Sequence, residues 1–286
     1  MTSFVDVPTL RGMLGSDRPP IVLGARWRYL GPSGDELFAQ GHIPGSVYLD
    51  LDDDLSGEPG PGGRHPLPDP AAFAAAVRRA GVALDRPVVV SDRGDGTIAA
   101  RLWWLLRHHG HDEVFVLDGG FTAWVADGGD IEIGPITPPY DDDGPATDHP
   151  FTADVARLPV VDASAAAETA RSGVLLDARA PARYAGEVEP LDPVAGHIPG
   201  ALNAPTSMSV GSDMRLRDRE LVTRGFANLG VTPGVPVAAY CGSGVTAAHT
   251  VLVLHHLGIE AALFPGSWSQ WISDPEHPVA VGSTPG

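Results

Sequence analysis

The sequence predicts an α/β protein made of two tandem copies of one domain, each a parallel sheet flanked by helices. The pentapeptide Gly-His-Ile-Pro-Gly occurs at Gly41 to Gly45 and again at Gly196 to Gly200, which is 155 residues later (196 − 41). In both halves, short β-branched runs alternate with helical patterns, as is typical of βαβ units around a parallel sheet. A duplicated open-sheet domain explains both observations.

The segments around the pentapeptide repeat in the same order. Apolar runs typical of buried strands lie before and after each copy, and the later runs lead through Gly-rich turns into helical patterns. The paired runs are 21–26 with 174–179 and 87–92 with 236–241, the helical patterns include 70–80 and 246–257, and a Gly and Trp pattern ends each half at 118–124 and 265–271.

Residues 127–150 separate the two halves. They are rich in Gly, Pro and Asp, a composition that resists helix and sheet and suits an extended connector. We therefore expect a first domain at 1–126, a linker at 127–150 and a second domain at 151–286.

Composition excludes several classes of function. With 43% apolar residues, 286 residues can bury a full core, but the net charge of −17 repels phosphate backbones and acidic lipids. The start of the chain lacks a basic and then apolar leader, and no run reaches about 18 apolar residues. The single cysteine cannot form an internal disulfide. We expect a cytoplasmic protein that binds neither nucleic acid nor membranes.

Cys241 is the candidate nucleophile. It closes a predicted strand, and Gly242, Ser243 and Gly244 lead from it into a predicted helix. A sulfur atom at the carboxyl end of a parallel strand faces backbone N–H groups and a positive helix end, which favour the thiolate. A lone Cys in an apolar strand is often only a small buried hydrophobe, but the Gly-x-Gly turn favours a chemical role.

Two other interpretations of this loop fit less well. The Gly242-x-Gly244-x-x-Ala247 pattern of dinucleotide-binding loops requires a carboxylate at the end of the next strand, and Glu260 lies before that strand. A cysteine phosphatase requires an Arg six residues after the Cys, and Ala247 occupies that position.

The sequence resembles the tandem rhodanese-type sulfurtransferases, and within them the 3-mercaptopyruvate sulfurtransferase branch, over nearly the whole chain. The resemblance rests on the paired pentapeptides, on residues 177–179, 183–184 and 266–271, and on the loop Cys241-Gly242-Ser243-Gly244-Val245-Thr246. It implies that Cys241 takes sulfur from a small donor as a persulfide, without a cofactor. The acceptor would be cyanide or a thiol, including a thioredoxin-like protein. Only the second domain would be catalytic, because Asp92 stands at the position of Cys241 in the first.

The same resemblance assigns further residues. Arg183 would bind an anionic donor, although the sequence alone favours its pairing with Glu187. Asp177 and Arg179 are expected to brace the loop. His42 would reach an interdomain cleft by analogy, and bonding within its own turn is the alternative.

Donor choice depends on the residues that follow Cys241. Family members that use thiosulfate carry Cys-Arg-Lys-Gly, whereas Gly242 and Ser243 occupy those places here, so we predict 3-mercaptopyruvate as donor and thiosulfate as the alternative. Ser243 would hydrogen-bond the persulfide or polarise the donor, or serve only the turn. The mercaptopyruvate branch usually has a second Arg near Leu191, which this chain lacks. A non-catalytic module that binds a partner or senses redox state is the remaining alternative.

His108, His109 and His111 have a spacing that resembles metal ligands. They follow a helical pattern, so we expect cations near a helix C-terminus and no metal site. His255 and His256 occupy the equivalent place in the second half.

Overall fold

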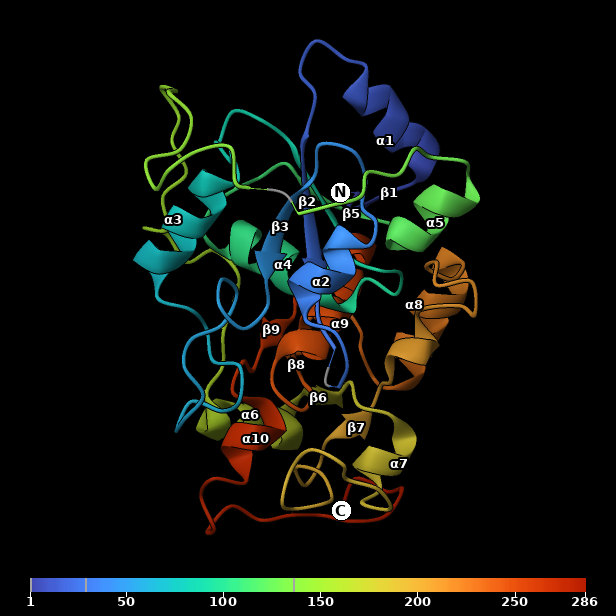
Figure 1. Cartoon of the computed structure of the whole chain (residues 1–286). Coiled ribbons are helices and arrows are strands. Elements are labelled where there is room, and N and C mark those ends of the chain that lie inside the picture. The colour runs from blue at the N-terminus through green and yellow to red at the C-terminus, as the bar shows by residue number, and fades with distance from the viewer. Residues whose placement is uncertain (1, 29, 136) are drawn as a thin grey trace.

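The computed structural model describes residues 2–28, 30–135 and 137–286, which form two parallel sheets with helices packed on them (Figure 1). The first sheet has the order β1-β5-β4-β2-β3 and the second β7-β6-β8-β9. Their strands are β1 (Phe4–Val5), β2 (Ile21–Arg26), β3 (Val47–Asp50), β4 (Val88–Ser91) and β5 (Val114–Leu117), then β6 (Val174–Asp177), β7 (Leu202–Asn203), β8 (Val237–Tyr240) and β9 (Ala262–Leu263). The predicted fold class is confirmed.

The two sheets repeat one pattern of pairing. Strand β2 pairs with β3 and β4 as β6 pairs with β7 and β8, and β4 pairs with β5 as β8 pairs with β9. The isolated parallel bridge between Val160 and Leu263 takes the place of the β1–β5 pairing. The second half therefore repeats the whole first sheet, with its outer strand reduced to one bridge.

Aspartates begin several of the helices. Asp6, Asp69, Asp162 and Asp218 each accept backbone N–H groups of the first turn, where a carboxylate is also favoured by the helix dipole. Part of the acidic surplus thus has a structural role. The helices of the first half are α1 (Val7–Leu14), α2 (Gly34–Ala39), α3 (Pro70–Arg79), α4 (Thr97–His108) and α5 (Gly120–Ala126). Those of the second half are α6 (Ala163–Ser172), α7 (Pro181–Tyr184), the 3₁₀ turn η1 (Thr206–Met208), α8 (Arg219–Asn228), α9 (Val245–Leu257) and α10 (Ser267–Trp271).

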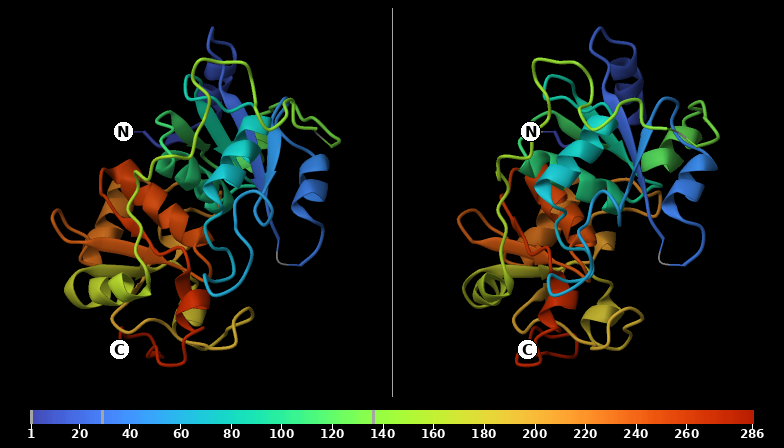
Figure 2. Two further views of the ribbon diagram at one scale, coloured as in Figure 1. Left: turned by 90° about the vertical axis from the view of Figure 1, so that its left-hand side faces the viewer. Right: turned by 60° about the vertical axis from the view of Figure 1, so that its left-hand side comes forward.

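Helices α4 and α9 join the two halves, and Figure 2 shows them in the middle of the molecule. One continuous apolar core includes residues of both, and the Trp103 ring lies 5.2 Å from that of His255. Because α4 follows β4 and α9 follows β8, this packing brings the carboxyl ends of both sheets to one cleft.

The repeated pentapeptide has a structural role in both halves. Nδ1 of His42 donates to the Phe38 carbonyl (3.0 Å), and the imidazole stacks on the Phe38 ring. His197 makes the same two contacts with Tyr184, with a hydrogen bond of 2.8 Å. Both histidines are fully buried. The pentapeptide therefore holds the entry to β3 and to β7.

The connector between the halves runs along the outside of the molecule (Figure 2). His108 and His109 donate to the carbonyls of Leu158 and Val155, which follow the connector, at 3.0 and 3.1 Å, and His111 donates to a carbonyl of the first half. Burial lowers the pKa of all three imidazoles, so the expectation of cations at a helix end is wrong. His108 and His109 thus attach the segment after the connector to the C-terminal end of α4.

None of the helices within the described residues is long and apolar enough to cross a membrane.

His249 on α9 makes stability depend on pH. Burial lowers its pKa to about 4, so protonation favours the unfolded chain. The stability that neutral His249 contributes is fully present above the unfolded pKa of about 6.5 and is lost as pH falls toward 4. The unfolding free energy of the wild type should therefore fall between pH 7 and 5. We expect this fall to be smaller by about 2 kcal/mol in His249→Leu, measured by urea denaturation. The exposed His149 gives the matched control, and equal slopes in wild type and His249→Leu would contradict the assignment.

Candidate active site

Cys241 follows β8 directly, and its side chain is buried against the loop that leads into α9. The Cys241 N–H donates to the Ser267 hydroxyl (3.0 Å), and the Cys241 and Gly242 carbonyls accept from the N–H groups of Trp268 and Ser269. The predicted Gly and Trp pattern at 265–271 thus forms the brace that holds this loop.

Gly244 is required by the path of the chain. It adopts a left-handed conformation, and a Cβ atom there would lie 2.3 Å from the Pro265 carbonyl oxygen. Gly244 is also the N-cap of α9, so the helix begins directly behind the loop and directs its positive end toward Cys241.

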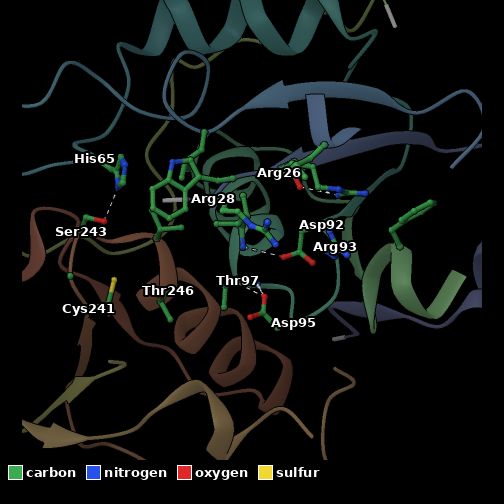
Figure 3. A pocket seen from close by; sticks show the side chains of 18 of the residues that line it. Arg26, Arg28, His65, Asp92, Arg93, Asp95, Thr97, Cys241, Ser243 and Thr246 are labelled. Atoms are coloured by element: carbon green, nitrogen blue, oxygen red, sulfur yellow. Dashed lines mark hydrogen bonds between the residues drawn. The ribbon is translucent and has the colours of Figure 1, made fainter. Parts of the chain in front are cut away.

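The loop opens into a cavity of about 680 Å³ between the two halves. Figure 3 shows Cys241 and Ser243 on one side and first-half residues across from them. Cys241, Gly242, Ser243, Val245 and Thr246 all line this cavity. The predicted loop residues are therefore brought together at one surface, with Gly244 behind them.

Ser243 belongs to a hydrogen-bonded chain that the sequence did not predict. Its hydroxyl lies 2.7 Å from Nδ1 of His65, and Nε2 of His65 lies 3.1 Å from Asp52. Since a carboxylate only accepts, Nε2 carries the ring proton and Nδ1 accepts from Ser243. Burial lowers the pKa of His65, Asp52 opposes this shift, and Arg64 and Arg101 add to it, so the ring is neutral at pH 7 and its Nδ1 lone pair is free to accept a proton.

No local motif marks His65 or Asp52, which lie in the loop between β3 and α3. Their partner Ser243 is 178 residues away from His65 in the chain. Only the packing of the two halves brings them to the loop.

Arg101 of α4 supports the His65 segment from inside the core. Its guanidinium donates to the carbonyls of Leu55, His65 and Pro66, while its Nη1 is buried without a hydrogen-bond partner. Burial lowers the pKa of Arg101 to about 10, and the charge of Cys241 opposes that shift. A buried cation from the first half therefore acts electrostatically on the thiol.

Arg183 reaches the loop from α7, and Arg64 reaches it from the first half. A Cβ atom on Gly242 would lie 3.1 Å from a nitrogen of Arg64 and 3.4 Å from one of Arg183. Gly242 itself carries no charge, but two guanidiniums lie beside it. Although the loop itself carries no cation, two arginines therefore lie close to it. One of them is Arg64, whereas the usual second Arg near Leu191 is missing from this chain.

Buried carboxylates orient these two arginines. Arg183 binds Glu189 (2.6 Å) and Asp192 (3.3 Å), and Arg64 binds Asp192, whereas the side chains of Glu189 and Asp192 are only 3% and 4% exposed. The alternative pairing of Arg183 with Glu187 does not occur. Burial acts to raise the pKa of Glu189, but hydrogen bonds from Arg183 and from backbone N–H groups outweigh it and lower the pKa.

Asp177, the last residue of β6, forms a buried ion pair with Arg179. Arg179 donates to both Asp177 oxygens and to the Gly196 carbonyl, and its guanidinium lies 4.7 Å from the Trp268 ring. Neither residue lines the cavity, and His42 does not line it either. These three side chains hold strand ends and turns.

Asp92 occupies the place of Cys241 in the first half. Its carboxylate accepts from the backbone N–H groups of Gly94, Gly96, Ile98 and Ala99. Burial raises the pKa of Asp92, and these donors partly oppose the shift. The backbone N–H groups of the first loop are therefore bound by a side chain of the same loop.

The cavity is positively charged although the protein is acidic. Five arginines line it, namely Arg26, Arg28, Arg64, Arg93 and Arg183, against the two acids Asp92 and Asp95. The whole chain has 19 basic and 36 acidic residues. The cleft therefore concentrates cations and favours anionic ligands.

Fold and site together define a class: a duplicated α/β protein with a buried thiol at the carboxyl end of a parallel strand, facing a cationic cleft between the two copies. The model of the rhodanese-like domain matches the chain twice, at residues 16–127 and 161–274. The chain belongs to the family of proteins with rhodanese-like domains.

Relatives of known name agree with this assignment. SseB of Mycobacterium tuberculosis, provisionally named a thiosulfate sulfurtransferase, is 42% identical over 98% of this chain and 97% of its own. The 3-mercaptopyruvate sulfurtransferase of Escherichia coli is 35% identical over 85% of this chain and 84% of its own. The crystal structure of SseA from Escherichia coli superposes with a TM-score of 0.80 at 33% identity, covering 94% of this chain and all of that chain.

Proposed function

We propose that the protein is a sulfurtransferase that moves a sulfane sulfur from 3-mercaptopyruvate to a thiophilic acceptor through a persulfide on Cys241. The observation that carries the proposal is the position of the Cys241 thiol, beside two arginines and a Ser243–His65–Asp52 chain in one cavity. A relative in Pseudomonas aeruginosa, 44% identical over 92% of both chains, is provisionally named a 3-mercaptopyruvate sulfurtransferase.

In the first half-reaction, the Cys241 thiolate attacks the donor sulfur. A bond forms between Sγ and that sulfur, the carbon–sulfur bond breaks, and its electron pair goes into pyruvate enolate. The proton of the Cys241 thiol passes to Ser243 as the Ser243 proton passes to His65, and Asp52 stabilises the imidazolium. Return of that proton to the enolate carbon gives pyruvate and restores neutral His65.

This proton path favours 3-mercaptopyruvate over thiosulfate. Deprotonation of Cys241 serves either donor, but sulfite leaves thiosulfate as a stable anion and requires no proton, so only 3-mercaptopyruvate also needs the Ser243 chain to return a proton to the leaving carbon. Arg183 and Arg64 would bind the carboxylate of the donor beside Gly242. Thiosulfate remains the alternative because the SseB relative is named for it and the same guanidiniums attract sulfite.

The second half-reaction takes place in the same cavity. Cyanide or a thiol, including that of a thioredoxin-like protein, attacks the outer sulfur and restores the Cys241 thiolate. A module that only binds a partner or senses redox state would require neither the Ser243 chain nor the paired arginines.

The domain limits follow from the connector. We assign residues 1–126 to the non-catalytic domain, 127–150 to the linker and 151–286 to the catalytic domain. The single free thiol fits a reducing compartment, so we place the protein in the cytoplasm.

Excess donor is expected to add one sulfur, about 32 Da, to the intact mass of the protein. Cys241→Ser should add none and should lose all turnover, because a hydroxyl cannot form a persulfide. Asp92→Ala should still add one sulfur, since Cys241 remains. A mass gain in Cys241→Ser, or none in wild type with either donor, would contradict the proposal.

Ser243→Ala tests the donor. It breaks the path to His65, so kcat/KM for 3-mercaptopyruvate, which needs that path twice, should fall about 100-fold, and that for thiosulfate, which needs it once, should fall clearly less. Steady-state rates with cyanide as acceptor measure both. If wild type prefers thiosulfate, or if Ser243→Ala affects both donors equally, the assignment of 3-mercaptopyruvate is wrong.

Arg183→Ala and Arg64→Ala should each raise KM for 3-mercaptopyruvate about tenfold, with a smaller effect on kcat, because uniform binding of the donor carboxylate is lost. Arg183→Lys should recover only part of it, since an ammonium lacks the planar fork. Arg224→Ala, at an exposed pair on α8, is the control. Unchanged KM in the Arg64 variant would show that Arg64 only holds Asp192.

A further inference from the structure

The cavity is larger than the proposed donor requires. Pockets of roughly 300–1,000 Å³ hold drug-sized ligands, and this one measures about 680 Å³. A three-carbon acid bound at Arg64 and Arg183 occupies only the end beside Cys241. The remaining space extends to β4, α4 and α5 of the first half, where nothing in the donor half-reaction uses it.

Two exposed arginines line this far end of the cavity. Arg28 and Arg93 line the cavity with exposed side chains, and neither forms an ion pair or a side-chain hydrogen bond within the described part of the chain. Figure 3 shows both across the cavity from Cys241. The guanidiniums of Arg64 and Arg183, in contrast, are held by carboxylates.

The acids at this end are already used within their own loop. Asp92 accepts four backbone N–H groups, and Asp95 accepts from the N–H and the hydroxyl of Thr97. Burial lowers the pKa of Arg26, the charge of Asp92 opposes this shift, and the charge of Arg93 adds to it. Three arginines thus face two acids at this end of the cavity, and the surplus positive charge favours an anion from outside.

Apolar side chains also line the cavity, namely Leu37, Leu51, Ile98, Phe121 and Val125. A ligand that spans the cavity therefore needs a sulfur atom at the Cys241 end, an anionic group at the Arg28 and Arg93 end, and apolar parts that can contact these side chains.

We propose that the Arg28 and Arg93 end of the cavity binds the anionic group of the sulfur acceptor, a small thiol with a carboxylate on an extended arm. The inference rests on the proposed function, because this thiol takes its sulfur from Cys241. Its thiolate attacks the outer sulfur of the persulfide, a new sulfur–sulfur bond forms, and the bond to Sγ breaks. The electron pair returns to Sγ as thiolate, and the acceptor leaves as a persulfide.

Glutathione and its diethyl ester form a matched pair of probes, because they share the thiol and the arm and differ in their carboxylates. We expect Arg28→Gln and Arg93→Gln each to raise KM for glutathione about fivefold, and the double variant to raise it further. KM for the ester and the rate of persulfide formation from donor should stay within about twofold. Arg224→Gln on α8 is the control.

Binding of S-methylglutathione by calorimetry tests the site without turnover. This probe keeps the carboxylates but cannot accept sulfur, and we expect the double variant to weaken its binding at least fivefold. Equal KM for glutathione in wild type and the double variant, or an equal loss for the ester, would overturn the inference. If donor adds no sulfur to wild-type Cys241, the proposed function fails, and S-methylglutathione binding that is lost in the double variant still supports an anion site.

Discussion

Helices α4 and α9 pack against each other where the two halves meet, and the cleft exists because of that contact. Each helix follows the strand whose carboxyl end carries a loop, so their packing turns the Asp92 loop and the Cys241 loop toward one cavity. His65, Arg64 and Arg101 all come from the first half and reach the second-half loop only in this arrangement. A first half without its own thiol thus still supplies much of the environment of the sulfur, which explains why its buried interface is maintained.

The two loops are variants of one anion cradle. In the first half, the Asp92 carboxylate accepts hydrogen bonds from four backbone N–H groups, so these donors need no anion from outside. In the second half, the equivalent position carries a thiol, and the loop backbone is held from behind by Ser267, Trp268 and Ser269. The same backbone architecture therefore carries a carboxylate in one copy and a thiol in the other. The difference lies in one side chain and in what packs around it.

Charge is distributed in opposite ways on the surface and in the cleft. Aspartates cap helices and cover the exterior, which keeps an acidic protein soluble and uses the helix dipoles. Arginines line the cleft: Asp192 and Glu189 hold two of them next to Gly242, and two at the far end form no ion pair with any residue that the structure describes. Anionic molecules are thereby concentrated at the sulfur against the net charge of the whole chain.

The sequence determined what depends on local patterning and on repetition. The paired pentapeptides, the β-branched runs and the Gly-rich turn after Cys241 sufficed to predict the duplicated parallel sheets and the loop that leads into α9, because each is set within a short stretch of chain. Only the tertiary structure decided the partners that come from far away. His65 and Asp52 reach Ser243, Arg64 lies beside Gly242, and the pKa of His108 is lowered because it is buried against the segment that follows the connector. No periodicity encodes these contacts, since they arise when two separately patterned halves pack through α4 and α9.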